Sequence, residues 1–166
     1  MSVEFRIASS DDMLRETAAL ACEIWHECFT DIISEGQIDY MVEKFQSYDA
    51  MKGQISSQGY VYHEVICDGK LCGYFAVKAE SDDRFFLSKL YLHKDSRGKG
   101  IASQMLAKVF TEARNAGKKK VYLTVNKHND HAIEVYRKTG FVTADAVVTD
   151  IGGGYVMDDY IMEYNL

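Results

Sequence analysis

The chain has 166 residues, of which 47% are hydrophobic and 27% are charged. This length and composition suit one folded domain with a packed core and exclude an intrinsically disordered chain. No apolar run approaches the roughly 20 residues that a membrane-spanning helix needs, and the N-terminus lacks the basic patch and apolar run of a signal peptide. We therefore expect a single domain over residues 1–166, located in the cytoplasm and without a membrane partner.

The net charge of −6 is unevenly distributed. Residues 1–66 contain 12 acidic and 4 basic side chains, a balance of −8, whereas residues 84–138 contain 4 acidic and 13 basic ones, a balance of +9. The simple interpretation is solubility and chance. The alternative is that the second region binds an anionic ligand and that the first region meets a cationic one.

The first half of the chain alternates short strand and helix signals. "VEFRI" is a short strand, and residues 10–29 form a helix whose apolar residues recur at helical spacing. Residues 37–48 form a second, short helix. Residues 60–66 and 71–79 are rich in β-forming residues and are joined by a tight turn, which predicts a hairpin.

The second half contains a strand at 85–92, a long helix from about Gly100 to Gly117 and a strand at 120–125. A shorter helix at 129–139 precedes a final hairpin that turns at residues 152–154. Strand, helix and strand between 85 and 125 need a right-handed crossover and a parallel pair. The fold class is therefore α+β (mixed α/β): a mostly antiparallel sheet of about seven strands, one parallel pair, and helices on both faces.

The four cysteines have neither the spacing of a zinc site nor a CxxC motif. In the predicted hairpin, a two-residue turn at 68–69 places Cys67 opposite Lys70 and Cys72 opposite Val65. The two sulfurs are then diagonal neighbours, which does not favour a disulfide. We expect free thiols and a reducing compartment.

The stretch "DSRGKGIASQ" (95–104) combines glycines and cations where the long helix begins. A helix N-terminus has unpaired N–H groups and a positive partial charge, so it can bind an anion directly. Gly98 and Gly100 let a phosphate approach the main chain, while Arg97 and Lys99 add positive charge. A tight turn that merely needs glycine would give the same stretch. A Walker A loop is excluded by the spacing.

The context of this stretch decides between those interpretations. A strand, then Arg97-x-x-Gly100-x-Ala102, then a long helix resembles the GCN5-related N-acetyltransferase (GNAT) superfamily, whose motif is Q/R-x-x-G-x-G/A. The segment 129–141 matches the second signature of the family through the following residues: Asn129, Ala132, Tyr136, Gly140 and Phe141. The resemblance covers most of residues 60–166 and implies a GNAT-like fold.

The resemblance also implies acetyl-CoA as cofactor, with residues 60–166 as the core that binds it. Its arm would pair with the main chain of Leu90, Tyr91 and Leu92, where an N–H would also meet the oxyanion. Its pyrophosphate would lie on the start of the helix, at residues Gly98, Lys99, Gly100, Ile101, Ala102 and Ser103. Arg97 and Lys99 would screen the phosphates, and Asn129 would hydrogen-bond the arm.

Tyr136 is the catalytic residue that the resemblance implies, as the acid for the departing thiolate. An ordinary half-buried tyrosine is the alternative, since the chain has 11 tyrosines. An unshifted tyrosine, with a pKa of about 10, is a weaker acid than a thiol with a pKa of about 8.5. Many family members carry a glutamate base in the fourth strand, but Ser88, Lys89 and Leu90 stand there, so the base stays unassigned.

The acceptor side is assigned to residues 1–58, with the 152–154 loop as a wall. Trp25 and Phe29 are its aromatic candidates, and Glu64 and Glu80 are its acidic candidates on the hairpin strands. The acidic first third suits a small-molecule or peptide amine, such as a polyamine for an enzyme resembling the PaiA type. No histidine or cysteine spacing indicates a metal. A homodimer is compatible with the sequence.

Two other functions fit parts of the sequence. A sensor module would bind CoA without transferring an acyl group. A nucleic-acid-binding protein would use the basic stretches at 97–100 and 118–120, but the overall acidity and the lack of a recognised motif argue against it. We therefore predict an acetyl-CoA-dependent N-acetyltransferase with a primary amine as acceptor and no nucleic-acid partner.

Overall fold

A computed structural model describes all residues from 1 to 166, and it contains one seven-stranded sheet. The strand order is β1-β2-β3-β4-β5-β7-β6, and every neighbouring pair is antiparallel except β4 and β5. The strands are β1 (Val3–Ile7), β2 (Tyr60–Cys67), β3 (Lys70–Ala79), β4 (Arg84–Leu92), β5 (Lys120–Asn126), β6 (Val142–Gly152) and β7 (Tyr155–Asn165). The predicted fold class, with its single parallel pair, is confirmed.

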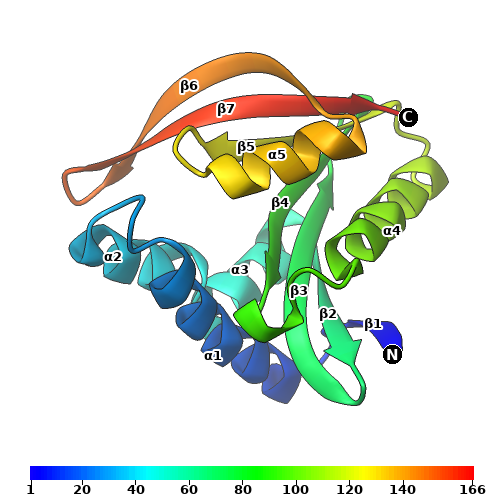
Figure 1. Ribbon diagram of the computed structural model, residues 1–166, viewed down its shortest axis with the longest axis horizontal. Helices are drawn as coiled ribbons and strands as arrows, with labels where there is room; N and C mark the ends of the chain where they lie inside the picture. The colour runs from blue at the N-terminus through cyan, green and yellow to red at the C-terminus, as the bar shows by residue number, and fades with distance from the viewer.

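Five α-helices cover the sheet on both faces (Figure 1). They are α1 (Asp11–Cys28), α2 (Glu35–Phe45), α3 (Tyr48–Gln58), α4 (Ile101–Asn115) and α5 (Asp130–Thr139), with a short 3₁₀ turn at Lys94–Ser96. Helices α4 and α5 enclose the larger hydrophobic core on one face, and α1 and α3 enclose a second core on the other. No helix is both long and apolar enough to cross a bilayer.

Helix α3 is the one regular element that the sequence did not predict. Its amphipathic signal is weak, because only Met51 and Gln54 are buried along its 11 residues. Ser47 accepts a hydrogen bond from the Ala50 N–H and starts the helix immediately after α2 ends at Phe45. A polar helix this short depends on its cap and on tertiary contacts for stability.

Strands β4 and β5 pair over a short distance and then separate. Their register contains three residue pairs, of which Phe86 and Tyr122 form the last. At the same level the β3–β4 register shifts, because Ala76 faces Lys89 while Val77 faces Leu87, which leaves Ser88 as a bulge. The sheet therefore opens from Leu87 onwards, and one edge of β4 has no strand beside it.

The prediction of free thiols in the β2–β3 hairpin is wrong. Cys67 faces Lys70 as expected, but Val65 faces Gly73, so the register slips and Cys72 lies in a bulge. The bulge turns Cys72 toward Cys67; their Cα atoms are 6.0 Å apart and the two residues form a disulfide. The expectation of a reducing compartment loses this support. The remaining cysteines are free.

Candidate active site

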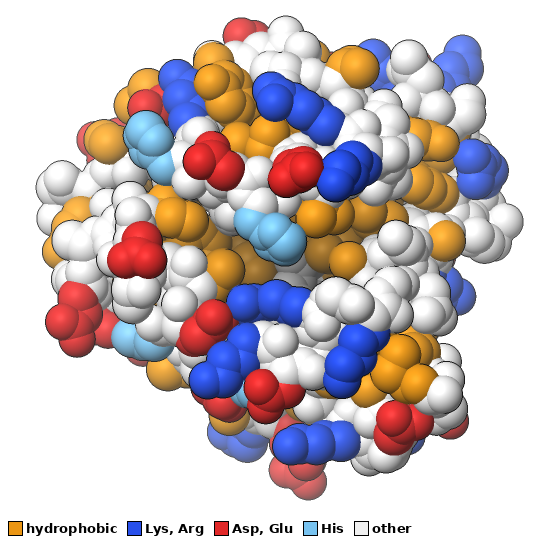
Figure 2. Space-filling view, viewed as in Figure 1, with side chains coloured by type: hydrophobic (Ala, Val, Ile, Leu, Met, Phe, Trp, Pro, Cys, Tyr) orange, Lys and Arg blue, Asp and Glu red, His pale blue; other side chains and the backbone are white.

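The opening between β4 and β5 is part of a cavity of about 1290 Å³. Its walls come from the separated strand ends, the first turns of α4 and α5, and helices α1 to α3. Figure 2 shows a hollow across the middle of this face, with a hydrophobic floor and basic side chains along its lower edge. The cavity therefore passes through the sheet and reaches both helical layers.

The N-terminus of α4 has unbonded main-chain donors. Gly98 and Gly100 both have positive φ angles, 74° and 78°, and no side chain caps the helix. The N–H groups of residues 98–103 donate no hydrogen bond within the protein. The other four α-helices each have a capping side chain, namely Ser10, Ser34, Ser47 and Asn129. This arrangement fits an anion, and in particular the pyrophosphate of CoA.

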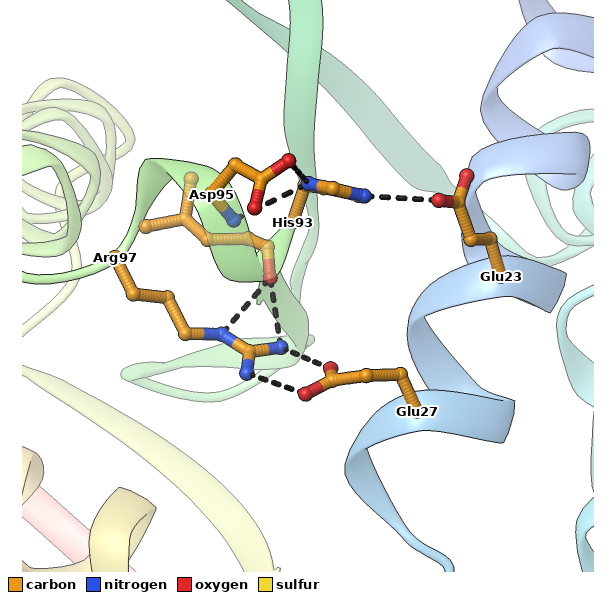
Figure 3. A network of polar contacts seen from close by, with 6 residues as sticks. Glu23, Glu27, His93, Asp95 and Arg97 are labelled. Atoms are coloured by element: carbon orange, nitrogen blue, oxygen red, sulfur yellow. Dashed lines mark hydrogen bonds and ion pairs between the residues drawn. The ribbon is translucent and has the colours of Figure 1, made fainter.

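Arg97 has partners other than those predicted for it. Its guanidinium forms a two-point ion pair with Glu27 on α1, at 3.1 and 2.8 Å, and also donates to the carbonyl of Leu92 (Figure 3). The neighbouring His93 lies 2.8 Å from Glu23, one turn earlier on α1. Lys99, by contrast, is exposed and forms no ion pair.

The β4 segment that was predicted to bind the CoA arm is part of the cavity wall. Leu90, Tyr91 and Leu92 all line the cavity, and no strand pairs with their outer edge. Leu90 and Leu92 pack into the core beneath α4, whereas Tyr91 points to the α1 side. An extended ligand could hydrogen-bond this edge as an added strand.

Helix α5 contributes Tyr136 and Asn129 to the same cavity. Tyr136 is 9% exposed, and its hydroxyl makes no hydrogen bond to protein, so it is free to contact a ligand. Burial raises the pKa of this phenol well above its ordinary value, so it stays protonated. Asn129 accepts a hydrogen bond from the Ala132 N–H as the helix cap, and its amide NH₂ group is left to donate.

The acceptor-side predictions divide into two that line the cavity and two that do not. Trp25 and Phe29 stack with ring centroids 4.2 Å apart and lie on the cavity wall beside Tyr91. Glu64 is buried under α1 and accepts a hydrogen bond from Thr17. Glu80 accepts a hydrogen bond from Tyr122. Neither glutamate lines the cavity.

Residues 152–154, which were predicted to form a wall, do not line the cavity, but they belong to a hairpin whose strand β7 does. This hairpin is fastened to α2. The Tyr40 hydroxyl donates to the carbonyl of Ile151 at 2.6 Å, and Gln37 donates to the carbonyl of Val156 at 2.8 Å. In Figure 1 this long hairpin, β6 and β7, extends over to α2. These contacts hold Met157, which lines the cavity, on the α2 side.

Two buried charged residues that line the cavity were not expected from the sequence. Lys89 on β4 is 6% exposed and donates to the carbonyl of Phe45, the amide oxygen of Gln54 and the hydroxyl of Tyr62. Asp159 on β7 is 4% exposed and has no protein partner. Asp159 lies in the cavity because β7 pairs with β5, and the sequence alone does not reveal that pairing.

The separated strands, the uncapped glycine loop and the through-going cavity define a CoA-binding acyltransferase fold. The chain belongs to the acetyltransferase (GNAT) family, whose sequence model matches residues 19–141. The family uses acetyl-CoA, and the geometry of the α4 N-terminus fits that cofactor.

Among curated relatives, an uncharacterised N-acetyltransferase of Mycobacterium tuberculosis is 38% identical over 96 residues. These residues are 57% of this chain and 60% of the relative, so the match spans less than two thirds of it. An uncharacterised N-acetyltransferase of Lactobacillus delbrueckii is 24% identical over 140 residues, with 79% of this chain and 80% of the relative covered.

Solved structures share the whole fold. The PaiA N-acetyltransferase of Thermoplasma acidophilum, crystallised with coenzyme A, matches with a TM-score of 0.83 and 24% identity over 100% of both chains. A GCN5-related N-acetyltransferase of Rhodopseudomonas palustris matches with a TM-score of 0.82 and 17% identity, covering 100% of this chain and 97% of the other. At these sequence identities, the similarity establishes only that this chain shares their fold.

Proposed function

We propose that the protein transfers the acetyl group of acetyl-CoA to a primary amine of a small molecule or peptide by direct attack. One observation carries the proposal. A single cavity connects the unbonded N–H groups at the start of α4, the free edge of β4 and the aromatic chamber formed by Trp25 and Phe29. Donor and acceptor could therefore meet inside the sheet.

The residues present would divide the work along this cavity. The N–H groups of residues 98–103 and the ammonium of Lys99 would hold the phosphates, and the β4 edge at 90–92 would align the arm. Acetyl-CoA supplies an activated acetyl thioester. Holding both reactants in one geometry lowers the barrier by removing their relative freedom.

Tyr136 would assist by hydrogen bonding to the departing sulfur. Because burial keeps its pKa far above that of a thiol, full proton transfer from this phenol to a thiolate is unfavourable. The neutral hydroxyl can still donate a hydrogen bond to developing negative charge. Such help lies at or below the roughly 10²–10⁴-fold that is typical of acid–base catalysis.

The acceptor class follows from the chamber on the α1 side. Trp25, Phe29 and Met41 supply an apolar part of its wall, and the carboxylates of Asp31 and Asp49 lie exposed at its border without ion-pair partners. This combination favours a cationic amine with a hydrocarbon body, such as a polyamine. The PaiA N-acetyltransferase shares the fold over its full length, which is compatible with this class.

The test is thiol release from acetyl-CoA with a panel of polyamines, amino acids, aminoglycosides and peptides, with products identified by mass spectrometry. We expect one or more amines to release CoA and gain an acetyl group. Tight CoA binding with no release for any amine would instead support the sensor function.

A matched pair of variants tests the cofactor loop itself. Gly98→Asp places a carboxylate among the N–H donors, and we expect CoA affinity to fall at least about 10-fold through charge repulsion. Gly69→Asp is the control, because Gly69 has a similar φ of 80° and equally open surroundings in a distant turn. Equal CoA affinity in the two variants would remove the α4 N-terminus from the binding site.

A further inference from the structure

Asp159 is a buried carboxylate that faces the cavity without a partner. It lies on β7 opposite Asn126, the last residue of β5, at the end of the opening between β4 and β5. It is 4% exposed, lines the cavity, and takes part in no hydrogen bond or ion pair with the protein. The adjacent Asp158, by contrast, forms an ion pair with Lys127 at 2.9 Å.

The surroundings of Asp159 compensate its negative charge only in part. An ionised carboxylate that is buried without a partner is costly, so such groups are paired or become protonated. Burial, and then the nearby Asp158, raise the pKa of Asp159 to about 6, while Lys127 lowers it only in part. Above that pH the carboxylate is ionised, and it can bind a cationic ligand or accept a proton from one.

Asp31, Asp49 and Lys89 also line the cavity, but the phenol and thiol groups closest to Asp159 carry no negative charge at physiological pH. Tyr91 on β4 interacts electrostatically with Asp159, with Tyr136 on α5 and with the thiol of Cys28 on α1. Burial raises the pKa of all three of these groups, so none becomes an anion near pH 7. Asp159 is the one buried carboxylate that lines the cavity.

The position of Asp159 relates it to the acceptor and not to the donor. Met157, two residues earlier on the same face of β7, packs with Trp25 and Phe29 in the cluster beneath α2. The donor-side residues, by contrast, belong to α4 and α5 on the opposite face of the sheet. A ligand that enters the aromatic chamber with its ammonium foremost would meet the carboxylate at the point where the sheet opens.

Building on the proposed function, we propose that Asp159 binds the ammonium group of the acceptor and takes one proton from it. The free amine nitrogen then forms a bond to the acetyl carbonyl carbon, and the carbon–sulfur bond breaks with its electron pair on sulfur. The nitrogen loses its second proton to the thiolate, directly or through water, and Asp159 releases its proton to solvent. The sum is one amide, one CoA thiol and one proton from one ammonium and one thioester.

This assignment names the class of acceptor more closely. A primary alkylammonium whose neighbouring carbons are apolar would satisfy both the carboxylate and the surrounding rings. It also supplies the base that β4 lacks, since Lys89 on that strand is a donor to three acceptors. A base with a pKa slightly below the working pH is well suited to accept a proton.

The kinetic test compares Asp159→Asn with Asp158→Asn, an adjacent variant outside the cavity. With the fastest amine of the panel, we expect Asp159→Asn to lower kcat/KM at pH 7 by at least about 100-fold. The deficit should shrink as pH rises toward the pKa of the amine, because free amine then needs no base. CoA affinity should stay within about 2-fold in both variants, and Asp158→Asn should keep its rate. A rate within a few fold of the unmodified protein, or an unchanged pH profile, would overturn the proposal.

A second measurement does not depend on turnover. With CoA bound at pH 8, n-butylammonium chloride should raise the melting temperature of the unmodified protein more than sodium chloride does, and Asp159→Asn should lose the difference. An equal shift in both proteins refutes the role of Asp159 even if no amine in the panel is acetylated. If no amine is acetylated but the shift in melting temperature depends on Asp159, the ammonium-binding site is supported and the proposed transfer reaction is rejected.

Discussion

Gly73 on β3 allows the main chain of β4 to approach closely at the site where the CoA arm is expected. A Cβ atom at this position would lie 2.5 Å from the carbonyl oxygen of Tyr91 and 2.8 Å from Cδ2 of Leu92. Attractive contacts between such atoms need about 3.5 Å. In Gly73→Ala, the β4 main chain must therefore move by several tenths of an ångström to about 1 Å, toward the cavity.

We expect this substitution to affect both stability and cofactor binding. Overpacking of this kind typically costs about 1–3 kcal/mol, and each kcal/mol lowers Tm by roughly 2–4 °C for a chain of this size. Thermal denaturation should then show a loss of about 2–12 °C. Isothermal titration should show CoA affinity weakened by about 10-fold, because the edge at Leu90–Leu92 is displaced.

Gly53→Ala is the matched control for this prediction. Gly53 lies inside α3, on the acceptor side of the cavity, with no atom within 4 Å of a Cβ. Alanine should therefore stabilise the helix by roughly 0.5–1 kcal/mol and leave CoA affinity unchanged. If Gly73→Ala melts at the same temperature as the unmodified protein and binds CoA equally well, the close approach of β3 to β4 does not position the cofactor edge.

Three further predictions follow from other sites. Tyr136→Phe should lower kcat by up to about 100-fold in the thiol-release assay and keep CoA affinity within a few fold; unchanged turnover would remove the hydroxyl from the reaction. Lys89→Met should lower the free energy of unfolding in urea by about 1–3 kcal/mol, because Gln54 and its neighbouring acceptors lose a buried donor, and a variant as stable as the parent would contradict this. Thiol titration of the denatured, unreduced chain should find two reactive groups and four after reduction, since Cys67 and Cys72 are paired; four groups before reduction would show that the pair is not formed.

The features that sequence predicted best are those encoded over a few neighbouring residues. The start of α4 could be predicted because a glycine-rich entry to an amphipathic helix determines its own unpaired N–H groups, whatever packs around it. The same holds for the tight turn at 68–69.

Features that depend on distant contacts escaped prediction. Arg97, which was predicted to screen the phosphates, forms an ion pair with Glu27, 70 residues earlier in the chain. The disulfide required a bulge at Cys72. The bulge changes the face of the sheet to which this side chain points, and the alternating pattern of the strand does not predict it. Asp159 faces the cavity because β7 pairs with β5, and the neighbouring Asp158 gave no sequence signal to separate the two.

The ion pairs from α1 to the β4–α4 turn affect how variants of this protein should be designed. One face of that helix presents aromatic rings to the acceptor chamber, while Glu23 and Glu27 anchor the loop that leads to the phosphate-binding glycines. An acceptor specificity altered through Glu27 would therefore disturb the donor loop as well. Substitutions at Trp25 or Phe29 reshape the chamber without breaking that anchor, so they are the better starting points for redirecting the protein to a new amine.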